Sequence, residues 1–346
     1  MPPTPPARRI TLTNAAIAAG GVALFAVLIY RVGPGEVWRG FRQIGWGLAI
    51  IVLLGGLRFA ARALAWTLCI EPPNRLRFTD AFNAVVCGDT MGNVIPLGPL
   101  VSEAAKLACV RGRVAITPAL TALAIENILY SLSVATMIAA STVALLLSFD
   151  LDEGLREFSE IALAAIALLF GLALWVLWRR PAIVGSLPAA LRPAESSRMH
   201  RRLERVRGIE HEVYSFAARR PGALIPAVAA EAAFHALGIL EAHITLTLLG
   251  VQPTLLQSFI VEGSNRLLAV AFKFVPFQVG VGEVGTGLLT QILGLGTAPG
   301  VTLSLARKTR MFIWSIVGGF LLVRQGLTAR RLLDEAQRVP HVTPEM

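Results

Sequence analysis

NVIPLGPLVSEAAKL (residues 93–107) and KFVPFQVGVGEVGTGLL (residues 273–289) carry the same pattern at two places in the chain. Each stretch interrupts an apolar region with proline and glycine, and a glutamate follows the proline by seven residues: Glu103 after Pro96, and Glu283 after Pro276. Broken helices and buried carboxylates are both costly in hydrocarbon. Their recurrence in two halves is typical of transporters whose substrate site lies near the middle of the bilayer.

The composition is that of an integral membrane protein. Of the 346 residues, 55% are hydrophobic and 16% are charged, and the mean hydropathy is +0.64, which argues against a soluble enzyme. The formal net charge is +10, but the basic residues lie in loops beside apolar segments, where they orient the chain and contact anionic headgroups. We therefore expect no nucleic-acid partner. The three cysteines form no CxxC pair, so neither a disulfide framework nor a metal site is expected.

The apolar segments predict an all-α, polytopic membrane protein with about six full spans and two re-entrant helical hairpins. The full spans are expected over residues 15–30, 45–70, 119–149, 161–178, 224–249 and 301–323. The hairpins are expected over residues 81–110 and 255–295, broken at Pro96, Gly98, Pro276, Gly280 and Gly282. Residues 1–346 then form a single membrane domain, with one repeat over about 78–149 and a second over about 255–326.

Loop charges predict the orientation of these segments, because cytoplasmic loops carry an excess of lysine and arginine. Residues 179–220 hold ten arginines and four glutamates, whereas residues 150–160 hold five acids and one arginine. The first stretch is therefore expected in the cytoplasm of a bacterium and the second outside its inner membrane, with both termini cytoplasmic. The two hairpins then enter from opposite sides, which predicts an inverted-topology repeat.

The cytoplasmic linker, residues 179–222, contains a basic amphipathic stretch at residues 197–218. Such a helix either lies in the membrane interface as a lid or is a solvated linker, and the sequence leaves both open.

The repeat also predicts a charge pair near the middle of the membrane. Glu126 corresponds to Arg307, and each lies about 12 Å along its helix from the equivalent prolines Pro118 and Pro299, at a rise of 1.5 Å per residue. We expect these two charges to pair directly or through one shared partner.

Intramembrane charges are the candidates for a substrate or ion pathway. Glu103 and Glu283 follow the helix breaks, where each can line the pathway or cap its own hairpin. Arg58 and Arg62 share one helix face, and two further arginines share another; such forks suit phosphate, although ion pairing to glutamates is the alternative. The residues expected in the pathway are Arg58, Arg62, Asn93, Glu103, Lys106, Glu126, Glu262, Asn265, Arg266, Lys273, Glu283, Arg307 and Arg310.

Motifs for catalysis or cofactor binding are not evident in the sequence. The GxGxxG spacing at residues 280–285 follows no strand and precedes no Walker lysine, so a nucleotide site is not expected. Glu231 and His235 lie four residues apart, and polar lining of the cavity or helix-to-helix hydrogen bonding is favoured there over a metal site. No serine–histidine–aspartate order, nucleophile elbow or HExxH is present. We expect no enzyme activity and no cofactor.

The chain resembles, over nearly its whole length, the flippase-like transmembrane family named after the membrane region of lysylphosphatidylglycerol synthase. The motifs that carry the resemblance are Arg58-x3-Arg62-x3-Trp66, Asn93-x2-Pro96 with Glu103, Glu126, and Pro276 with Gly280-x-Gly282-Glu283. The first copy has Leu100-Val101-Ser102 where the family has a small, glycine-rich pattern. The resemblance implies movement of a polar lipid between leaflets. Lysine transfer is not expected, because the soluble aminoacyl-transferase domain of the synthases has no counterpart in this sequence.

Two functions follow as expectations. The first is a lipid flippase or transporter that moves a polar lipid, anionic or glycosylated, between leaflets, either downhill or coupled to an ion. The alternative is a non-transporting scaffold that presents lipid to a partner enzyme, a synthase or a glycosyltransferase. A scaffold needs no continuous polar path across the membrane, and this feature distinguishes the two.

Overall fold

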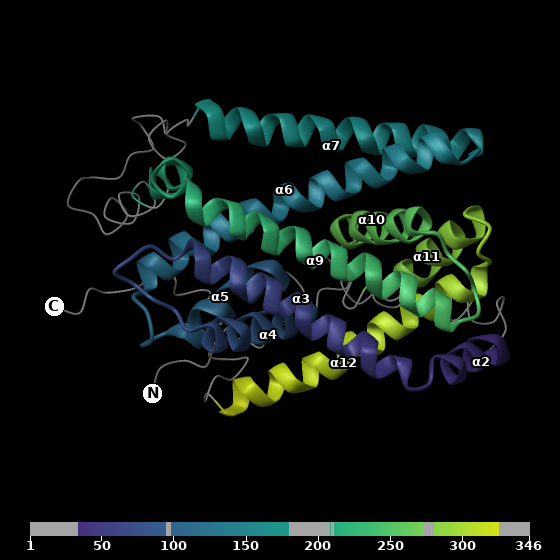
Figure 1. The fold of residues 1–346 in the computed structure, drawn as a ribbon, viewed down its shortest axis with the longest axis horizontal. Coiled ribbons are helices and arrows are strands. Elements are labelled where there is room, and N and C mark those ends of the chain that lie inside the picture. Colours follow the sequence, from purple (N-terminus) through teal and green to yellow (C-terminus); the bar gives the residue numbers. More distant parts are fainter. Residues whose placement is uncertain are drawn as a thin grey trace, which may run out of the picture.

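A computed structural model describes residues 34–94, 98–179, 208, 211–272, 278 and 280–324, and the regular elements in these ranges are helices (Figure 1). They are α2 (Pro34–Ile44), α3 (Gly47–Cys69), α4 (Phe78–Val94), α5 (Gly98–Val110), α6 (Ile116–Ser148), α7 (Glu153–Arg179), α9 (Pro221–Leu248), α10 (Leu255–Ala271), α11 (Val281–Ile292) and α12 (Thr297–Arg324). A short helical stretch over residues 211–219 precedes α9. The expected first span and most of the amphipathic linker lie outside the described residues.

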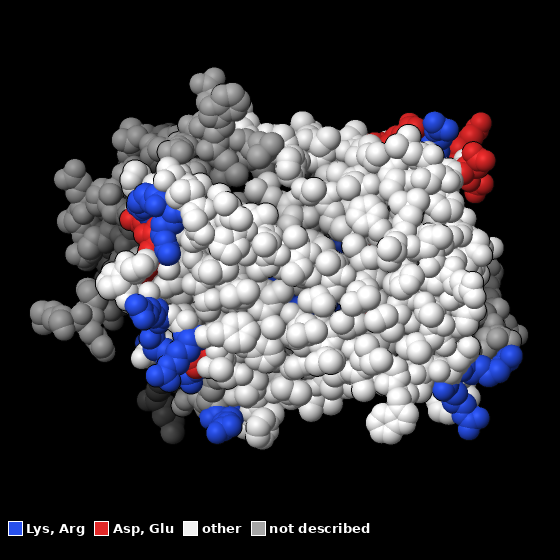
Figure 2. Space-filling view, viewed as in Figure 1, with Lys and Arg blue, Asp and Glu red and all other residues white. Residues whose placement is uncertain are grey.

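The outer surface of the bundle is apolar, as a membrane protein requires. Helices α3, α6 and α9 are each long and apolar enough to cross a bilayer, and even the shortest, with 23 residues, extends about 35 Å at 1.5 Å per residue. Large apolar side chains such as Leu53, Leu147 and Ile225 are exposed. Figure 2 shows charged side chains gathered at the two ends of the molecule, with an uncharged band between them. The prediction of an all-α membrane protein is confirmed.

The two interrupted apolar regions each form a pair of short helices that pack against each other. Helices α4 and α10 both contain 17 residues, and α5 and α11 contain 13 and 12. All four are shorter than the roughly 20 residues that a spanning helix needs. Gly280 precedes α11 with φ +86°, a backbone conformation that favours glycine. The interruptions lie in the two stretches where the sequence predicts them, with Gly98 at the start of α5 and Gly280 just before α11. The predicted break at Gly282 is wrong, because Gly282 lies within α11, and Pro96 and Pro276 lie outside the described residues.

The helices of the two halves make matching contacts. Helices α3 and α9 pack along each other, α12 packs on α4, and α6 packs on α10. In Figure 1 the α4–α5 pair lies toward the left end of the bundle and the α10–α11 pair toward the right. One helix of each short-helix pair thus packs on the long helix that follows the other pair.

Small residues allow these crossings to be close. A Cβ added at Gly318 of α12 would lie 2.0 Å from Thr90 Oγ1 and 2.9 Å from the Val86 carbonyl oxygen of α4. A Cβ added at Gly263 of α10 would lie 1.9 Å from Ser141 Oγ of α6. Both crossings leave no space for a methyl group at the glycine.

Gly318→Ala is expected to destabilise the protein by about 1–3 kcal/mol, the usual cost of overpacking, because the Val86 carbonyl belongs to the backbone and cannot rotate away. The neighbouring Gly319→Ala is the matched control, since a Cβ there meets nothing within 4 Å and alanine favours helix. Thermal unfolding in detergent should rank Gly318→Ala below the wild type and Gly319→Ala at or above it. Equal melting temperatures for the two variants would show that the α4–α12 crossing is not tight.

Three clusters make up the apolar core of the described residues, and two of them are large. One surrounds Trp66 and Leu123 and comes mainly from α3 to α6; the other surrounds Leu246 and Leu303 and comes from the end of α6 and from α9 to α12. Along α6, α9 and α12, buried charged residues lie between the segments that supply these clusters. The molecule therefore has a polar layer between two apolar ends.

Candidate functional site

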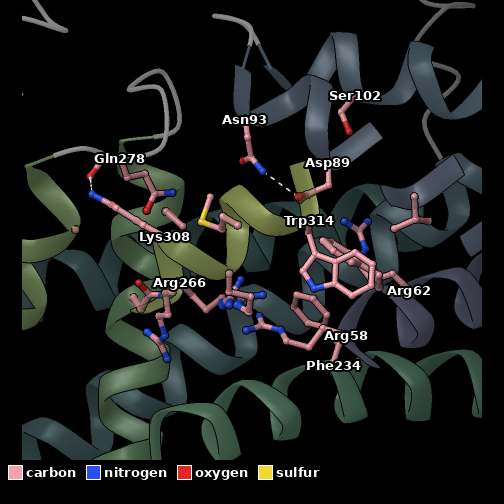
Figure 3. Close-up of a pocket in the computed structure, with 18 of the residues that line it drawn as sticks. Arg58, Arg62, Asp89, Asn93, Ser102, Phe234, Arg266, Gln278, Lys308 and Trp314 are labelled. Atoms are coloured by element: carbon pink, nitrogen blue, oxygen red, sulfur yellow. Dashed lines mark hydrogen bonds between the residues drawn. The ribbon is translucent and has the colours of Figure 1, made fainter. Parts of the chain in front are cut away.

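A cavity of about 220 Å³ lies in the polar layer, at the junction of the two short-helix pairs with α3 and α12 (Figure 3). Its lining is strongly basic. The seven lysines and arginines that line it are Arg58, Arg62, Lys106, Arg266, Arg307, Lys308 and Arg310, and the one acidic lining residue of the described chain is Asp89. Aromatic side chains, Phe59, Tyr130, Phe234 and Trp314, complete much of the wall.

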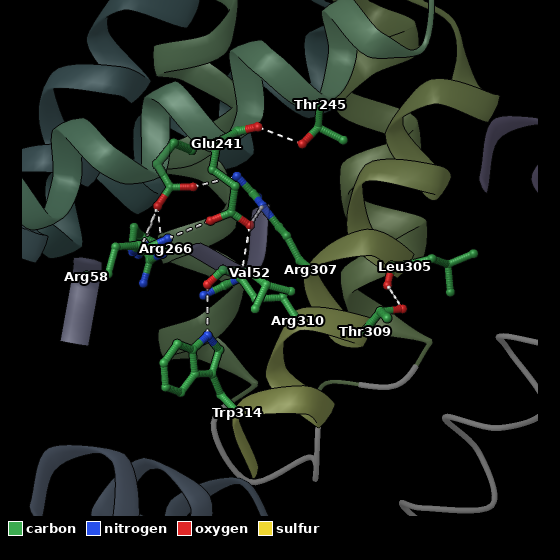
Figure 4. A network of polar contacts seen from close by, with 11 residues as sticks. Val52, Arg58, Glu241, Thr245, Arg266, Leu305, Arg307, Thr309, Arg310 and Trp314 are labelled. Carbon is green, nitrogen blue, oxygen red and sulfur yellow. Dashed lines mark hydrogen bonds and ion pairs between the residues drawn. The ribbon is translucent and has the colours of Figure 1, made fainter. Parts of the chain in front are cut away.

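Four of these arginines surround two carboxylates, Glu241 of α9 and Glu262 of α10 (Figure 4). Both glutamates are completely buried. We call this group the arginine–glutamate cluster; its members are Arg58, Arg266, Arg307, Arg310, Glu241 and Glu262. With four cations and two anions, the cluster keeps an excess of positive charge next to the cavity.

The cluster joins helices from both halves of the chain. Arg58 of α3 contacts Glu241 Oε2 at 3.3 Å and Glu262 Oε1 at 3.4 Å. Glu262 also pairs with Arg266 at 2.6 Å and with Arg307 at 2.7 Å. Buried charges need such partners, because an unpaired ion costs several kcal/mol to desolvate. The cluster therefore fixes α3, α9, α10 and α12 relative to one another.

A second ion pair connects α3 with α6. Arg62 donates from Nε to Glu126 Oε1 at 2.8 Å, and its Nη2 reaches the same oxygen at 2.6 Å. The guanidinium also stacks on Tyr130, with Cζ 4.0 Å from the ring centroid. Arg62 is thus held by Glu126 and Tyr130 and also borders the cavity.

The glutamates of the two signature stretches are held in similar ways. Glu103 accepts from Lys106 Nζ at 2.8 Å and from Asn127 Nδ2 at 2.9 Å. Glu283 accepts from Lys308 Nζ, and its other oxygen accepts the Gly280 N–H at 3.0 Å, which caps α11. Each glutamate therefore ties a short helix to the long helix that follows it, and the lysine ends remain at the cavity wall.

Several donors at the arginines have no hydrogen-bond partner among the described residues. They are Arg307 Nε and Nη1 and Arg310 Nε, all buried. Arg307 Nε and Arg310 Nε lie 3.7 and 3.1 Å from Glu241 Oε1 as ion pairs, but without hydrogen-bond geometry. Buried donors are normally satisfied. Their presence beside a basic cavity favours an anionic guest such as a phosphate.

The opposite wall carries the one acidic lining residue. Asp89 of α4 accepts from Asn93 Nδ2 at 2.8 Å (Figure 3). Across the cavity, Lys308 donates to the Gln278 carbonyl at 3.1 Å, in the interruption between α10 and α11. The short helices of both halves thus contribute polar groups to the same cavity.

The structure places the residues of the predicted pathway in two layers. Those that line the cavity are Arg58, Arg62, Asn93, Lys106, Asn265, Arg266, Gly282, Arg307 and Arg310. The glutamates, Glu103, Glu126, Glu262 and Glu283, are absent from the lining and pair with cations from behind it. Gly98 begins α5 and Gly280 precedes α11. Lys273, Pro96 and Pro276 lie outside the described residues.

The predicted pairing of Glu126 with Arg307 is wrong. Glu126 pairs with Arg62, whereas Arg307 pairs with Glu241 and Glu262, and no described side chain contacts both. The reason is the packing of the long helices: α6 packs on α3 and α9, whereas α12 packs mainly on α3, α4 and α11, and α6 and α12 do not pack closely on each other. Glu126 and Arg307 are therefore neutralised by different helices.

Sequence analysis did not assign Glu241, Asp89 or Phe234 to the site. Glu241 had a usable signal, since it is a carboxylate in a long apolar helix. Phe234 had none, because an aromatic residue in an apolar span resembles any core residue; its ring lies 4.3 Å from Arg58 Cζ. The expected helix-to-helix hydrogen bond of His235 is present, with Nε2 3.0 Å from Ser133 Oγ of α6.

Metal-binding clusters are absent from the described ranges: no group of three or more histidine, cysteine, aspartate or glutamate side chains could hold an ion there. Cys69, Cys87 and Cys109 are buried and free. The charged side chains that line the cavity are mainly guanidinium and ammonium groups.

Comparison with known proteins gives one match. The model of the family described as lysylphosphatidylglycerol synthase TM region matches residues 13–319, which include all the described elements except the last residues of α12. No curated protein matches the chain, and no solved structure matches it.

Proposed function

The chain belongs to the lysylphosphatidylglycerol synthase TM region family, and from this membership we propose that it moves a polar lipid between the leaflets of a bacterial inner membrane. The substrate has an anionic headgroup, with phosphate as the group recognised. In this proposal membrane lipids are the ligands, and the chain itself catalyses no reaction.

The observation that carries the proposal is the arrangement of positive and negative side chains around the cavity. Seven cationic side chains border the cavity while the carboxylates that balance them lie behind it. Guanidinium groups bind phosphate through paired, charge-assisted hydrogen bonds. The buried Arg307 Nη1 has no hydrogen-bond partner in the described residues, so a phosphate in the cavity would have this donor to bind. The acyl chains would stay in the bilayer, against the apolar outer surface.

The inverted-topology repeat is part of the same proposal. We infer that α3–α6 and α9–α12 are its two copies, related by an axis in the membrane plane. Support comes from the matched lengths of their short helices and from the paired contacts α4–α12 and α10–α6. The pairs Arg62–Glu126 and Glu241–Arg307 also occupy corresponding helices with their charges exchanged.

This repeat gives a simple route for alternating access. Each hairpin would open the cavity toward its own side of the membrane, the α4–α5 pair toward the cytoplasm and the α10–α11 pair toward the exterior. Both termini would then be cytoplasmic, in agreement with the arginine excess of residues 179–220.

Translocation of a fluorescent phosphatidylglycerol in proteoliposomes tests the proposal. Dithionite added outside quenches only probe in the outer leaflet, so exchange between leaflets appears as quenching beyond the outer pool. We expect the wild-type protein to exchange this anionic probe at least about tenfold faster than protein-free liposomes. Arg310→Gln, which removes a cavity cation, should slow exchange, whereas Arg324→Gln, on the exposed end of the same helix, should not.

Two other results would overturn the proposal that the protein is a flippase. Binding of the probe, measured by fluorescence anisotropy in detergent, together with exchange at the protein-free rate would indicate the lipid-presenting scaffold. A protein that neither binds nor exchanges the probe would show that the anionic lipid is not the ligand.

A further inference from the structure

We propose that Glu231, buried in α9, is a proton-binding site, and that the neighbouring Glu126 takes up a second proton that couples transport of the anionic lipid. The coupling rests on the proposed function, but the proton site rests on the geometry of the described residues alone. In the resting protein one proton is bound, on Glu231, while Glu126 is ionised beside Arg62.

Glu231 differs from every other fully buried glutamate of the described chain. Its side chain is 1% exposed, and neither carboxylate oxygen has a hydrogen-bond partner in the described ranges. Glu126, Glu241, Glu262 and Glu283 are equally buried, but each is paired with a lysine or arginine. An ionised carboxylate without a partner is very unfavourable in such surroundings, whereas a protonated one is not.

The charges around Glu231 are balanced when one proton is bound. Glu231 acts on Arg62 and Glu126 electrostatically, and Arg62 is the only ion-pair partner of Glu126 in the described residues. Glu126 Oε2 is buried and has no hydrogen-bond partner there. One guanidinium therefore faces two carboxylates, so a single bound proton makes the group neutral.

The other ionisable groups near Glu231 do not neutralise its carboxylate in place of this proton. Lys106 of α5 acts on Glu231 more weakly than Arg62 does and is itself paired with Glu103. Cys69 of α3 is a buried thiol within its range. On the same helix, His235 is one turn away, and α10 presents Arg266 and Glu262 to it. No ionisable group of α2 or α12 in the described ranges acts on Glu231.

Arg62 connects the proton to the substrate. It borders the cavity and its side chain is 16% exposed, compared with 2% for Glu126. When a headgroup phosphate binds Arg62, Glu126 loses its counterion, and a second proton taken up from solution then neutralises it. When the headgroup leaves, Arg62 returns to Glu126 and the proton is released. The lipid and the proton therefore travel in the same direction.

Infrared difference spectroscopy of the purified full chain tests the proton site without any transport. Wild-type protein at neutral pH should show the carbonyl band of a protonated carboxylic acid, shifted in deuterated water. Glu231→Gln should lack this band, Glu231→Asp should move it, and Glu157→Gln, on the exposed surface of α7, should keep it. Identical spectra for the wild type and Glu231→Gln would overturn the proposal. If Glu231→Gln does not fold, an unmoved band in Glu231→Asp would overturn it instead.

A pH gradient across proteoliposomes tests the coupling. With an alkaline lumen, wild-type protein should accumulate fluorescent phosphatidylglycerol in the inner leaflet, while Glu126→Gln, which cannot take up the second proton, should only equilibrate it. Accumulation by Glu126→Gln equal to that of the wild type would overturn the coupling and leave the flippase intact. Absence of all exchange by the wild type would overturn the proposed function, and the infrared result would then decide the proton site separately.

Discussion

Glu262→Gln is expected to lower the free energy of unfolding by about 3–5 kcal/mol, the cost of breaking a buried ion pair. Glu262 is completely buried and pairs with Arg58, Arg266 and Arg307. The substitution preserves the shape of the side chain but leaves Glu241 as the one carboxylate among four arginines of the cluster. Since these arginines come from α3, α10 and α12, the loss should loosen the whole centre of the bundle. Thermal unfolding in detergent would show a clear fall in melting temperature.

Two further variants separate this effect from a general response to losing a glutamate. Glu160→Gln removes an exposed ion pair with Arg156 on α7 and should change stability little, because exposed pairs contribute little. Glu262→Gln combined with Arg266→Gln removes one charge of each sign, and should be less destabilising than the sum of the single variants. Strict additivity, or an unchanged melting temperature for Glu262→Gln, would contradict the assembly role of the arginine–glutamate cluster.

Ala269→Glu is expected to reduce exchange of the anionic probe by about 10- to 100-fold. Ala269 lines the cavity on α10, so a glutamate there would face the cations without removing any existing pair. Its carboxylate would bind the arginines in place of the headgroup phosphate. A hydrogen bond to a charged group is worth about 1.5–3 kcal/mol, and 1.4 kcal/mol corresponds to a factor of ten.

Ala269→Gln is the matched control, because it has the same shape and no charge. It should exchange the probe much faster than Ala269→Glu, with any remaining loss caused by bulk. Both variants should unfold near the wild-type temperature, since no buried pair is broken. Equal exchange by the two variants would show that the size of the cavity, and not its charge, controls passage of the lipid.

The residue types in the polar layer were predictable, but their arrangement was not. Arginines in apolar helices are costly enough that their presence alone indicates a function or a partner, and Arg58 and Arg62 therefore stand out in the sequence. Their partners do not. Arg62 pairs with Glu126 at a separation of 64 residues, and Arg58 pairs with Glu262 at a separation of 204. The predicted pairing of Glu126 with Arg307 is wrong because two charges at the same depth in the membrane pair only if their helices are in contact.

By itself, the sequence determined the class of this protein and the places where its helices break. Hydropathy, proline and glycine act within a few residues of their position, so α3, α6, α9 and the interruptions before α5 and α11 could be located without coordinates. The tertiary structure alone decided that cations border the cavity while glutamates stand behind them, and that Glu231 is left without a partner. Those properties depend on which helix faces meet across the bundle, and long-range packing sets those faces, not local sequence.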